Sequence, residues 1–509
     1  MAGKVLFIVI DQLRADCVHG ALASSLDLPN FRRLMDDGVT FSQHYSVTAP
    51  CGPARASLLT GLYAMNHRSV RNGTPLAGHI PNIATEARKA GYEPLLFGYT
   101  DTSVDPEGRD ANDPDLKTYE GLMPGFSEMV QLRLDTSYSW VADLKSKGYD
   151  LPKHYWDIYR ADASAGSNHA EITGPALYRA EDSDTAFLTD HTLRALSVRE
   201  DQDWFAHVTF IRPHPPFVAP APYNAMYPPE AIPDPEGIGR LGALRQSHPF
   251  YEAFFATPAL KGLYIGFDGH LDWIAPEAAR ALRSVYFGLA SEVDAHIGRL
   301  LDYLEASGQA DDTLVVLTSD HGEMLGDHHM WGKESVFDPA FHVPLIIRDP
   351  RRRETAGTIV DRFTESIDVA PTILDWLGRK PALGFNGKSL LPFLDGQAPD
   401  GWRDHVFFEL DLSDPIDPTR YQRHFGLPVA ASNVAVLREE RFKLVHFNGG
   451  LPPLLYDLET GEGHDLATDP AYAPELLRLS RKMLDHRMAH ADHARSLMKL
   501  TADGVKSAQ

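Results

Sequence analysis

The sequence predicts an α/β fold, in which a large central sheet, mixed but mostly parallel, is flanked by helices and followed by a smaller α+β domain. Short, fully apolar runs such as Val5–Ile10 and Leu314–Thr318 are typical of buried strands. They alternate with segments of helical periodicity, the longest of which is Pro276–Ser307. This alternation favours a largely parallel sheet with helices on both faces.

Each element of the large domain is predicted from its own pattern. A glycine marks the end of two helices, Gly91 after the second and Gly308 after the longest. The expected strands are Val5–Ile10, Val39–Tyr45, Pro94–Phe97, Trp204–Ile211, Leu314–Thr318 and Val343–Ile347. The expected helices are Pro29–Asp37, Ile83–Ala90, Ser183–Val198, Pro276–Ser307 and Ala370–Leu377.

Two domains are expected, because 509 residues are too many for one simple core. The catalytic domain covers residues 1–389, with loop-rich insertions near 101–180 and 213–276. The smaller domain, residues 390–509, alternates like antiparallel strands and ends in a long helix. Its expected elements are the strands Val406–Leu410, Val434–Leu437, Phe442–Phe447 and Pro453–Leu458 and the helix Ala471–His490.

Composition limits the partners of this chain. Its formal net charge of −22 argues against nucleic acid, whose phosphates attract Lys and Arg, and against an anionic membrane surface. The first apolar run has six residues and no later run reaches membrane length, so we expect neither a signal peptide nor a membrane span. Cys17 and Cys51 are too few for a disulfide framework, and we expect reduced thiols in a cytoplasmic protein.

Cys51 stands just before Pro53 and a short helical stretch. Because Pro favours the first turn of a helix, Cys51 is expected at or next to a helix N-terminus, where free N–H groups and the helix dipole favour anions. An anionic substrate would need a locally positive site in this acidic protein, which suggests a metal ion. Arg55 follows too closely for the Cys-x5-Arg loop of cysteine phosphatases, so that mechanism is disfavoured.

Two acidic motifs follow predicted strands. Asp11-Gln12 comes directly after the first strand, and Ser319-Asp320-His321-Gly322-Glu323 follows another. Carboxylates at strand ends are where open α/β sheets build their sites, although a lone Asp there is more often a turn residue. His328 and His329 could suggest a second metal site, but a loop that shapes the pocket is the better interpretation.

The motif Cys51-x-Pro53-x-Arg55, followed by an apolar helix and Thr60-Gly61, resembles the signature of the type I sulfatases. These enzymes belong to the alkaline phosphatase superfamily, and the phosphonate monoester hydrolases are the most similar branch. The resemblance implies an alkaline phosphatase-like fold. It also implies that a formylglycine-generating enzyme oxidises Cys51 to formylglycine, whose hydrate is the nucleophile. Arg55 would hold that group and belong to the enzyme's recognition signal, although a purely structural ion pair would also explain it.

The same resemblance implies one divalent metal ion, Mn²⁺, Ca²⁺ or Mg²⁺, since oxygen-rich ligands with one imidazole suit these ions. Gln12 replaces the second Asp of the sulfatases, as in the phosphonate monoester hydrolase branch, and still offers a carbonyl oxygen. The expected ligands are Asp11, Gln12, the modified Cys51, Asp320 and His321.

Four positions match site residues of the family, and a fifth departs from its pattern. His214 and Lys333 would bind the anion and help protonate the leaving oxygen. Asn72 would donate to an anionic oxygen, although by itself it is more simply a turn residue before Gly. Tyr99 matches a site tyrosine, and Asp101 stands where phosphonate monoester hydrolases tend to have Thr. An added carboxylate there would disfavour a doubly charged substrate.

The resemblance therefore implies a metal-dependent hydrolase of small anionic esters, expected to be promiscuous and to act on sulfate monoesters, on phosphonate monoesters and phosphodiesters, or on both groups. The alternatives are a strictly phosphorus-specific enzyme on the same scaffold and a non-catalytic anion-binding relative. A homo-oligomer, dimer or tetramer, is expected because the insertions and the C-terminal helix offer surface for contacts.

Overall fold

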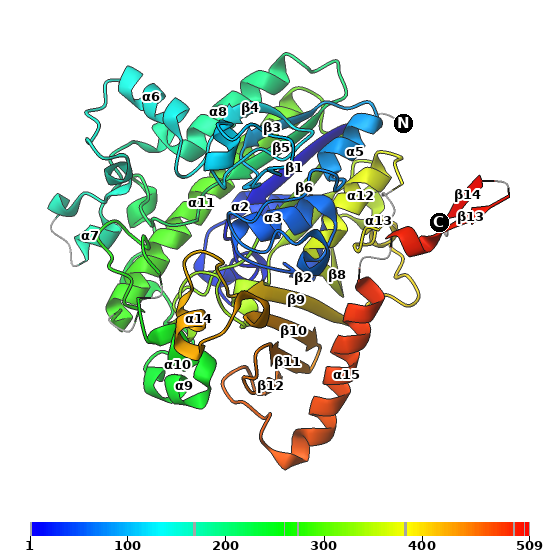
Figure 1. The fold of residues 1–509 in the computed structure, drawn as a ribbon. Helices are drawn as coiled ribbons and strands as arrows, with labels where there is room; N and C mark the ends of the chain where they lie inside the picture. The colour runs from blue at the N-terminus through cyan, green and yellow to red at the C-terminus, as the bar shows by residue number, and fades with distance from the viewer. Residues whose placement is uncertain are drawn as a thin grey trace.

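An eight-stranded sheet forms the centre of the large domain (Figure 1). The computed structural model describes residues 3–165, 169–258, 260–271, 274–380, 384–491, 494–502 and 504–507. From one edge to the other the strands are β4 (Ser127–Gln131), β3 (Pro94–Gly98), β5 (Phe205–Phe210), β1 (Lys4–Ile10), β6 (Thr313–Ser319), β7 (Leu345–Arg348), β2 (Val39–Tyr45) and β8 (Thr358–Glu365). The predicted α/β class is confirmed.

The sheet is parallel except for β7. β1 pairs in parallel with both β5 and β6, whereas β7 is antiparallel to β6 and to β2. The carboxyl ends of the parallel strands therefore meet at one edge, which is where polar residues that follow those strands can come together.

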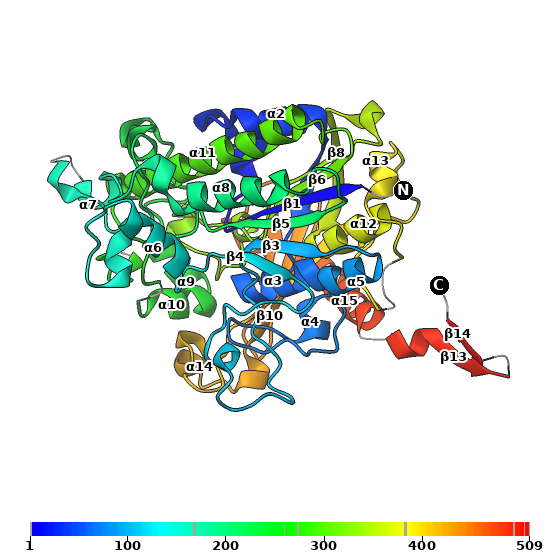
Figure 2. The same cartoon turned by 90° about the horizontal axis from the view of Figure 1, so that it is seen from above.

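Helices cover both faces of the sheet, as Figure 2 shows from above. Strand β1 shows why both faces are covered, because successive side chains of a strand point to opposite faces of the sheet. Leu6, Ile8 and Ile10 join one core cluster with the long helix, and Val5, Phe7 and Val9 join the other. The first face carries α2 (Pro29–Asp37), α8 (Asp184–Ser197) and α11 (Pro276–Ala306); the second carries α3 (Cys51–Thr60), α5 (Ile83–Lys89) and α12 (Val369–Trp376).

A second, antiparallel sheet follows, in the order β12-β11-β10-β9, with a long helix packed against it (Figure 1). Leu479 and Met483 of this helix are buried against strand residues such as Leu437 and Leu444. The elements are β9 (His405–Asp411), β10 (Asn433–Glu439), β11 (Phe442–Phe447), β12 (Leu454–Asp457) and α15 (Ala473–His490). The small hairpin β13 (Met498–Thr501) and β14 (Gly504–Ser507) projects beyond α15.

Two strands of the central sheet differ from the expectation. β4 lies inside the segment 101–180, which the sequence presents as an elaboration on the sheet rather than a part of it. β8 was not predicted at all. Both are edge strands with several exposed or half-buried residues, so neither shows the apolar run of a central strand.

Shorter helices connect these elements. They are α1 (Asp16–His19), α4 (Ala64–His67), α6 (Tyr138–Ser146), α7 (Ala170–Thr173), α9 (Leu241–Ser247), α10 (Pro249–Phe255), α13 (Leu391–Leu394) and α14 (Arg420–Phe425). Among the residues described, no helix combines the length and apolarity that a bilayer crossing requires.

Glu292 on α11 is a buried acid in the core of the large domain. It is 1% exposed, and within the described part of the chain neither carboxyl oxygen has a hydrogen-bond partner. Burial, assisted by the negative charge of Asp184, raises the pKa of Glu292 from 4.5 to about 8. The folded protein therefore keeps Glu292 protonated at pH values where the unfolded chain releases that proton.

We expect the variant Glu292→Gln to gain stability over the wild type as the pH rises from about 4.5 to about 8, and the gain to level off above that. Thermal unfolding across this pH range, compared between the two proteins, measures the effect. Glu277→Gln, at an exposed position of the same helix, is the matched control and should follow the wild type. If the difference in Tm between Glu292→Gln and the wild type did not change with pH, Glu292 would not be a carboxyl that the fold keeps neutral.

Candidate active site

The ends of two neighbouring strands bring the acidic motifs together. β1 and β6 run side by side in parallel with Ile10 opposite Ser319, so Asp11 and Asp320 leave the sheet at the same place. The buried backbone N–H of Gln12 donates to Asp320 Oδ1 at 3.1 Å, which ties the two turns to one another.

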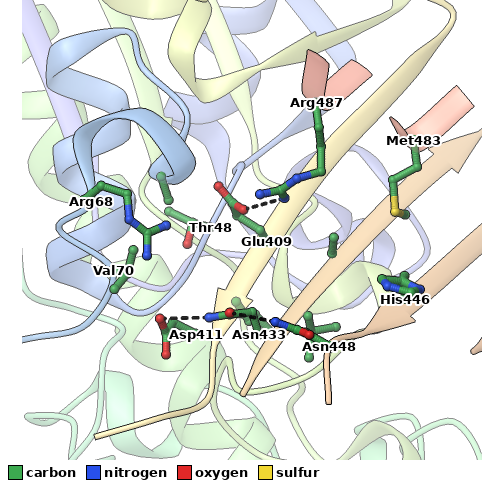
Figure 3. Close-up of a pocket in the computed structure, with 14 residues that line it drawn as sticks. Thr48, Arg68, Val70, Glu409, Asp411, Asn433, His446, Asn448, Met483 and Arg487 are labelled. Carbon is green, nitrogen blue, oxygen red and sulfur yellow. Dashed lines mark hydrogen bonds and ion pairs between the residues drawn. The ribbon is translucent and has the colours of Figure 1, made fainter. Parts of the chain in front are cut away.

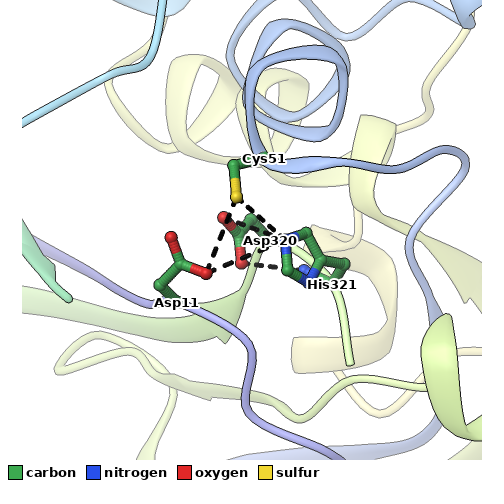
Figure 4. Close-up of side chains that lie close together, drawn as sticks. All are labelled: Asp11, Cys51, Asp320 and His321. Atoms are coloured by element: carbon green, nitrogen blue, oxygen red, sulfur yellow. Dashed lines mark hydrogen bonds and ion pairs between the residues drawn. The ribbon is translucent and has the colours of Figure 1, made fainter. Parts of the chain in front are cut away.

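Cys51 completes a tight cluster with these residues. It is the first residue of α3 and is 5% exposed. Its Sγ lies 3.2 Å from His321 Nε2 and 3.9 Å from Asp11 Oδ1. One ligand atom from each of Asp11, Cys51, Asp320 and His321 lies within 4.8 Å of all the others, and Figure 4 shows the four side chains pointing toward a common centre.

The donor set fits a divalent cation. Two carboxylates and an imidazole are buried together, an arrangement that is costly without positive charge between them. Burial, and then repulsion from Asp11, raises the pKa of Asp320 to about 6. Oxygen donors with one imidazole suit Mn²⁺, Ca²⁺ or Mg²⁺ better than a thiolate-seeking ion. Position 51 carries its unmodified thiol here, and burial, followed by the charge of Asp11, raises the pKa of that thiol.

Arg55 provides part of the compensating charge. It is 1% exposed, and its guanidinium donates to Asp320 at 3.0 Å and to Asp11 at 3.3 Å. The same group lies over the Tyr99 ring, 4.1 Å from its centroid. Burial alone would raise the pKa of Asp11, but the cations around it, Arg55 and Lys333 among them, hold that pKa below its usual range.

Gln12 belongs to a hydrogen-bonded chain next to the four-residue cluster. Its backbone has a positive φ of 68°, and its side-chain amide nitrogen donates to Glu323. Its Oε1 accepts from Lys333 Nζ at 2.7 Å, and Lys333 Nζ lies 3.2 Å from His214 Nε2. Three residues expected at the site, Gln12, Lys333 and His214, therefore form one connected group.

His214 is held as a neutral imidazole. Its Nδ1 lies 2.6 Å from the carbonyl oxygen of Pro215, which can only accept, so Nδ1 carries the proton and Nε2 accepts from Lys333. Burial, and then the positive charge of Lys333, lowers the pKa of His214 to about 3. Burial alone would lower the pKa of Lys333, but the acidic cluster raises it, so this ammonium stays charged at neutral pH.

The remaining expected substrate contacts lie around Cys51 with different partners. Asn72 accepts from the N–H of Gly52 at 2.9 Å, at the start of α3. The Tyr99 hydroxyl donates to Asp11 and accepts from Arg55 at 2.9 Å. Asp101 is buried with φ 48°, its Oδ1 has no partner among the described residues, and burial raises its pKa.

Glu323 is a residue that the sequence did not single out, although it stands in the second motif. It is fully buried and accepts hydrogen bonds from the N–H groups of Leu325 and Gly332 as well as from Gln12. It therefore fixes which end of the Gln12 amide faces Lys333, and it anchors the loop that carries Lys333. The only sequence signal was a carboxylate two residues after His321, too common a pattern to assign a role.

A separate cavity of about 260 Å³ contains none of the expected site residues (Figure 3). It lies between β9, β10, α15 and the segment that follows α4. Its acidic groups already have partners, since Glu409 binds Arg487 at 3.1 Å and Asp411 accepts from Asn433 at 3.0 Å. We assign it no role in the site.

Comparisons with known proteins identify the family of this chain. Residues 4–379 match the family model described as sulfatase, and residues 326–489 match the model of the N-sulphoglucosamine sulphohydrolase C-terminal region. The multifunctional alkaline phosphatase superfamily protein PehA of Trinickia caryophylli is 38% identical over 99% of this chain and 98% of its own length.

Two solved structures are similar over their whole length. The phosphonate monoester hydrolase SpPMH from Silicibacter pomeroyi is 53% identical, with a TM-score of 0.94 and 99% of each chain covered. The phosphonate monoester hydrolase of Agrobacterium radiobacter is 43% identical, with a TM-score of 0.94 and 100% of each chain covered. This chain therefore belongs to the sulfatase family, within the alkaline phosphatase superfamily.

Proposed function

We propose that this protein is a metal-dependent hydrolase that cleaves sulfate monoesters, phosphonate monoesters and phosphodiesters. The observation that carries the proposal is the cluster of Asp11, Cys51, Asp320 and His321, with Cys51 at the start of α3. The similarity to phosphonate monoester hydrolases and to sulfatases supports both substrate classes. The related transition states place similar oxygens against one cation, which makes promiscuity reasonable.

Residue 51 supplies the nucleophile in this proposal, as formylglycine made from Cys51 by a formylglycine-generating enzyme. One divalent ion, held by Asp11, Asp320, His321, the Gln12 oxygen and residue 51, would act as a Lewis acid toward the anionic ester. Arg55 orients the two carboxylates and balances their charge. The helix N-terminus at residue 51 adds N–H dipoles that favour an anion.

Lys333 is the proton donor that the geometry favours. Its ammonium faces the cavity beside the cluster, bridging Gln12 Oε1 and His214 Nε2. His214 and Gln12 each accept one hydrogen bond from Lys333, and so they would point the one remaining N–H of that ammonium toward the substrate oxygens. We assign to Lys333 the binding of the anion and the protonation of the leaving oxygen, and to His214 the positioning of Lys333. Asn72, Tyr99 and Asp101 would shape the part of the site around residue 51.

A substrate panel tests this function directly. The protein, supplied with Mn²⁺ and with the fraction of converted residue 51 measured by intact mass, is assayed with an aryl sulfate, an aryl phosphonate monoester and an aryl phosphodiester. We expect turnover of all three, with kcat proportional to the converted fraction. Turnover of the phosphorus esters alone would favour the phosphorus-specific alternative. Absence of all turnover in fully converted, metal-loaded protein would favour a non-catalytic anion-binding relative.

The proposal also covers the cellular compartment and the oligomeric state of the enzyme. We propose a cytoplasmic homo-oligomer, dimer or tetramer, with the formylglycine-generating enzyme as a transient partner. The free thiols of Cys17 and Cys51 support a reducing compartment such as the cytoplasm. The projecting hairpin β13–β14, with Leu500 82% and Val505 66% exposed, is consistent with a contact between subunits.

A further inference from the structure

An open cavity of about 450 Å³ lies directly beside the proposed catalytic groups. Gln12, His214 and Lys333 all line it, so a substrate held at the metal cluster would extend into this space. Its volume is in the range of sites that enclose small organic molecules. The cavity therefore has the position and the size to receive the organic part of the ester.

The wall of this cavity is mostly apolar, and both insertions contribute to it. Trp156 and Leu134 come from the segment 101–180, and Phe254, Leu260 and Ile265 come from the segment 213–276. Phe254 is 1% exposed and firmly packed, whereas Trp156 is 40% exposed. Aromatic and branched side chains on several sides are suited to a flat apolar group rather than to a strongly hydrated one.

The charge of the wall is positive. Lys333 and Lys261 both line the cavity, together with Arg420. Among the described residues that line it, the one carboxylate is that of Glu334, which forms an ion pair with Arg420. The guanidinium of Arg420 in turn lies over the Phe254 ring, 4.2 Å from its centroid. That face of the Phe254 ring is therefore already occupied by a protein cation.

We propose that this cavity binds the organic group of the ester and selects an uncharged, apolar group of about aromatic size over a cationic one. This inference rests on the proposed function, because it places the ester at the metal cluster. Specificity would come from the two insertions rather than from the metal site. Trp156 and Leu260 would be the contacts that determine it, and Lys261 would repel a cationic group.

The test compares benzyl and choline esters that carry the same sulfate or phosphonate group. Both have a primary alkoxide leaving group, and the ammonium of choline makes its alkoxide the better one, so leaving-group chemistry does not account for a preference for the benzyl ester. In the active enzyme we expect kcat/KM for the benzyl ester to exceed that for the choline ester by at least about tenfold, a difference ordinary for an apolar contact. Trp156→Ala and Leu260→Ala should each reduce this ratio several-fold.

Matched control variants separate a specific contact from a general loss of surface. Tyr138→Ala and Leu177→Ala remove exposed apolar side chains, 67% and 42% exposed, that do not line the cavity. Both should leave the benzyl-to-choline ratio unchanged. Lys261→Glu should shift the ratio several-fold toward the choline ester, and this shift should weaken with added salt because Lys261 is exposed.

A binding measurement separates this inference from the proposed function. Isothermal titration of the two esters into metal-loaded Cys51→Ala protein requires no turnover, and we expect the benzyl ester to bind more tightly. If this preference were found and the fully converted, metal-loaded wild type turned over no ester, the cavity assignment would be supported and the hydrolase overturned. An active enzyme with equal kcat/KM for both esters, or with a ratio that Trp156→Ala, Leu260→Ala and Lys261→Glu all leave unchanged, would overturn the cavity assignment alone.

Discussion

The variant Cys51→Ala should lose hydrolysis of every ester in the substrate panel, by a factor on the order of 10⁴ or more, as when a catalytic nucleophile is removed. Cys51 begins α3, and its Sγ faces His321 and Asp11 inside the cluster. In the described part of the chain no other side chain stands both at a helix N-terminus and within this acidic cluster. Initial rates with an aryl sulfate and an aryl phosphonate measure the loss.

Cys17→Ala is the matched control, because Cys17 is the other cysteine and is equally buried. It lies on α1, outside the cluster, and should leave both rates within about twofold, as expected for a variant that removes no catalytic contact. Intact mass should show a residue lighter than cysteine at position 51 in the wild type and in Cys17→Ala. Full activity in Cys51→Ala, or an unmodified thiol in a fully active wild type, would contradict the assigned nucleophile.

The central part of the fold could be predicted because its strands are buried on both faces. Such strands appear in the sequence as apolar runs, and Val5–Ile10 and Leu314–Thr318 each fall inside an observed strand, β1 and β6. The edge strand β8 could not be found this way, because Thr358, Ile359, Asp361 and Arg362 are exposed. An edge strand is defined by its neighbour, and single-sequence periodicity carries no information about that neighbour.

The residues of the candidate site also fall into two groups, those that local sequence identifies and those that only tertiary packing identifies. Residues that follow apolar strands or stand in a compact motif, such as Asp11, Cys51 and Asp320, could be proposed from local sequence, and the structure places them together. The roles of Glu323 and Trp156 depend on which loops pack against one another. Glu323 has its effect through Gln12, more than 300 residues earlier in the chain, and Trp156 comes from a loop-rich insertion. Only tertiary packing reveals such partners.

The second large effect is expected for Asp320→Asn, which should remove most of the affinity for a divalent ion. Asp320 is fully buried and shares the centre of the cluster with Asp11 and His321. A neutral amide is a weaker ligand for a hard cation than a carboxylate. Isothermal titration with Mn²⁺ should show a Kd raised by about 100-fold or more, since altering even the outer partners of a metal site costs 10–100-fold.

Thermal unfolding separates lost metal binding from misfolding. Mn²⁺ at about 100 times its Kd stabilises a folded protein by about 2.7 kcal/mol, so the wild type should show a clear rise in Tm that Asp320→Asn lacks. Without metal, the variant should unfold close to the wild-type Tm. The raised pKa of Asp320, about 6, shows that burial and Asp11 disfavour its charge. Relief of that charge offsets the hydrogen bonds that an amide loses, because Asp320 accepts from Gln12 and His321 on one oxygen and from Arg55 on the other.

A control variant shows whether a lost response to Mn²⁺ is specific to Asp320. Asp36→Asn changes an exposed carboxylate on α2 that is not part of the cluster, and it should retain the wild-type response to Mn²⁺. If Asp320→Asn kept that response, the ion would bind elsewhere, and the cluster would be an internal ion-pair network around Arg55. Asp320→Asn is instead expected to lose the response to Mn²⁺ and to keep its Tm without metal. That result would mean that the two carboxylates of the cluster repel one another in the metal-free protein and that the cation relieves this repulsion.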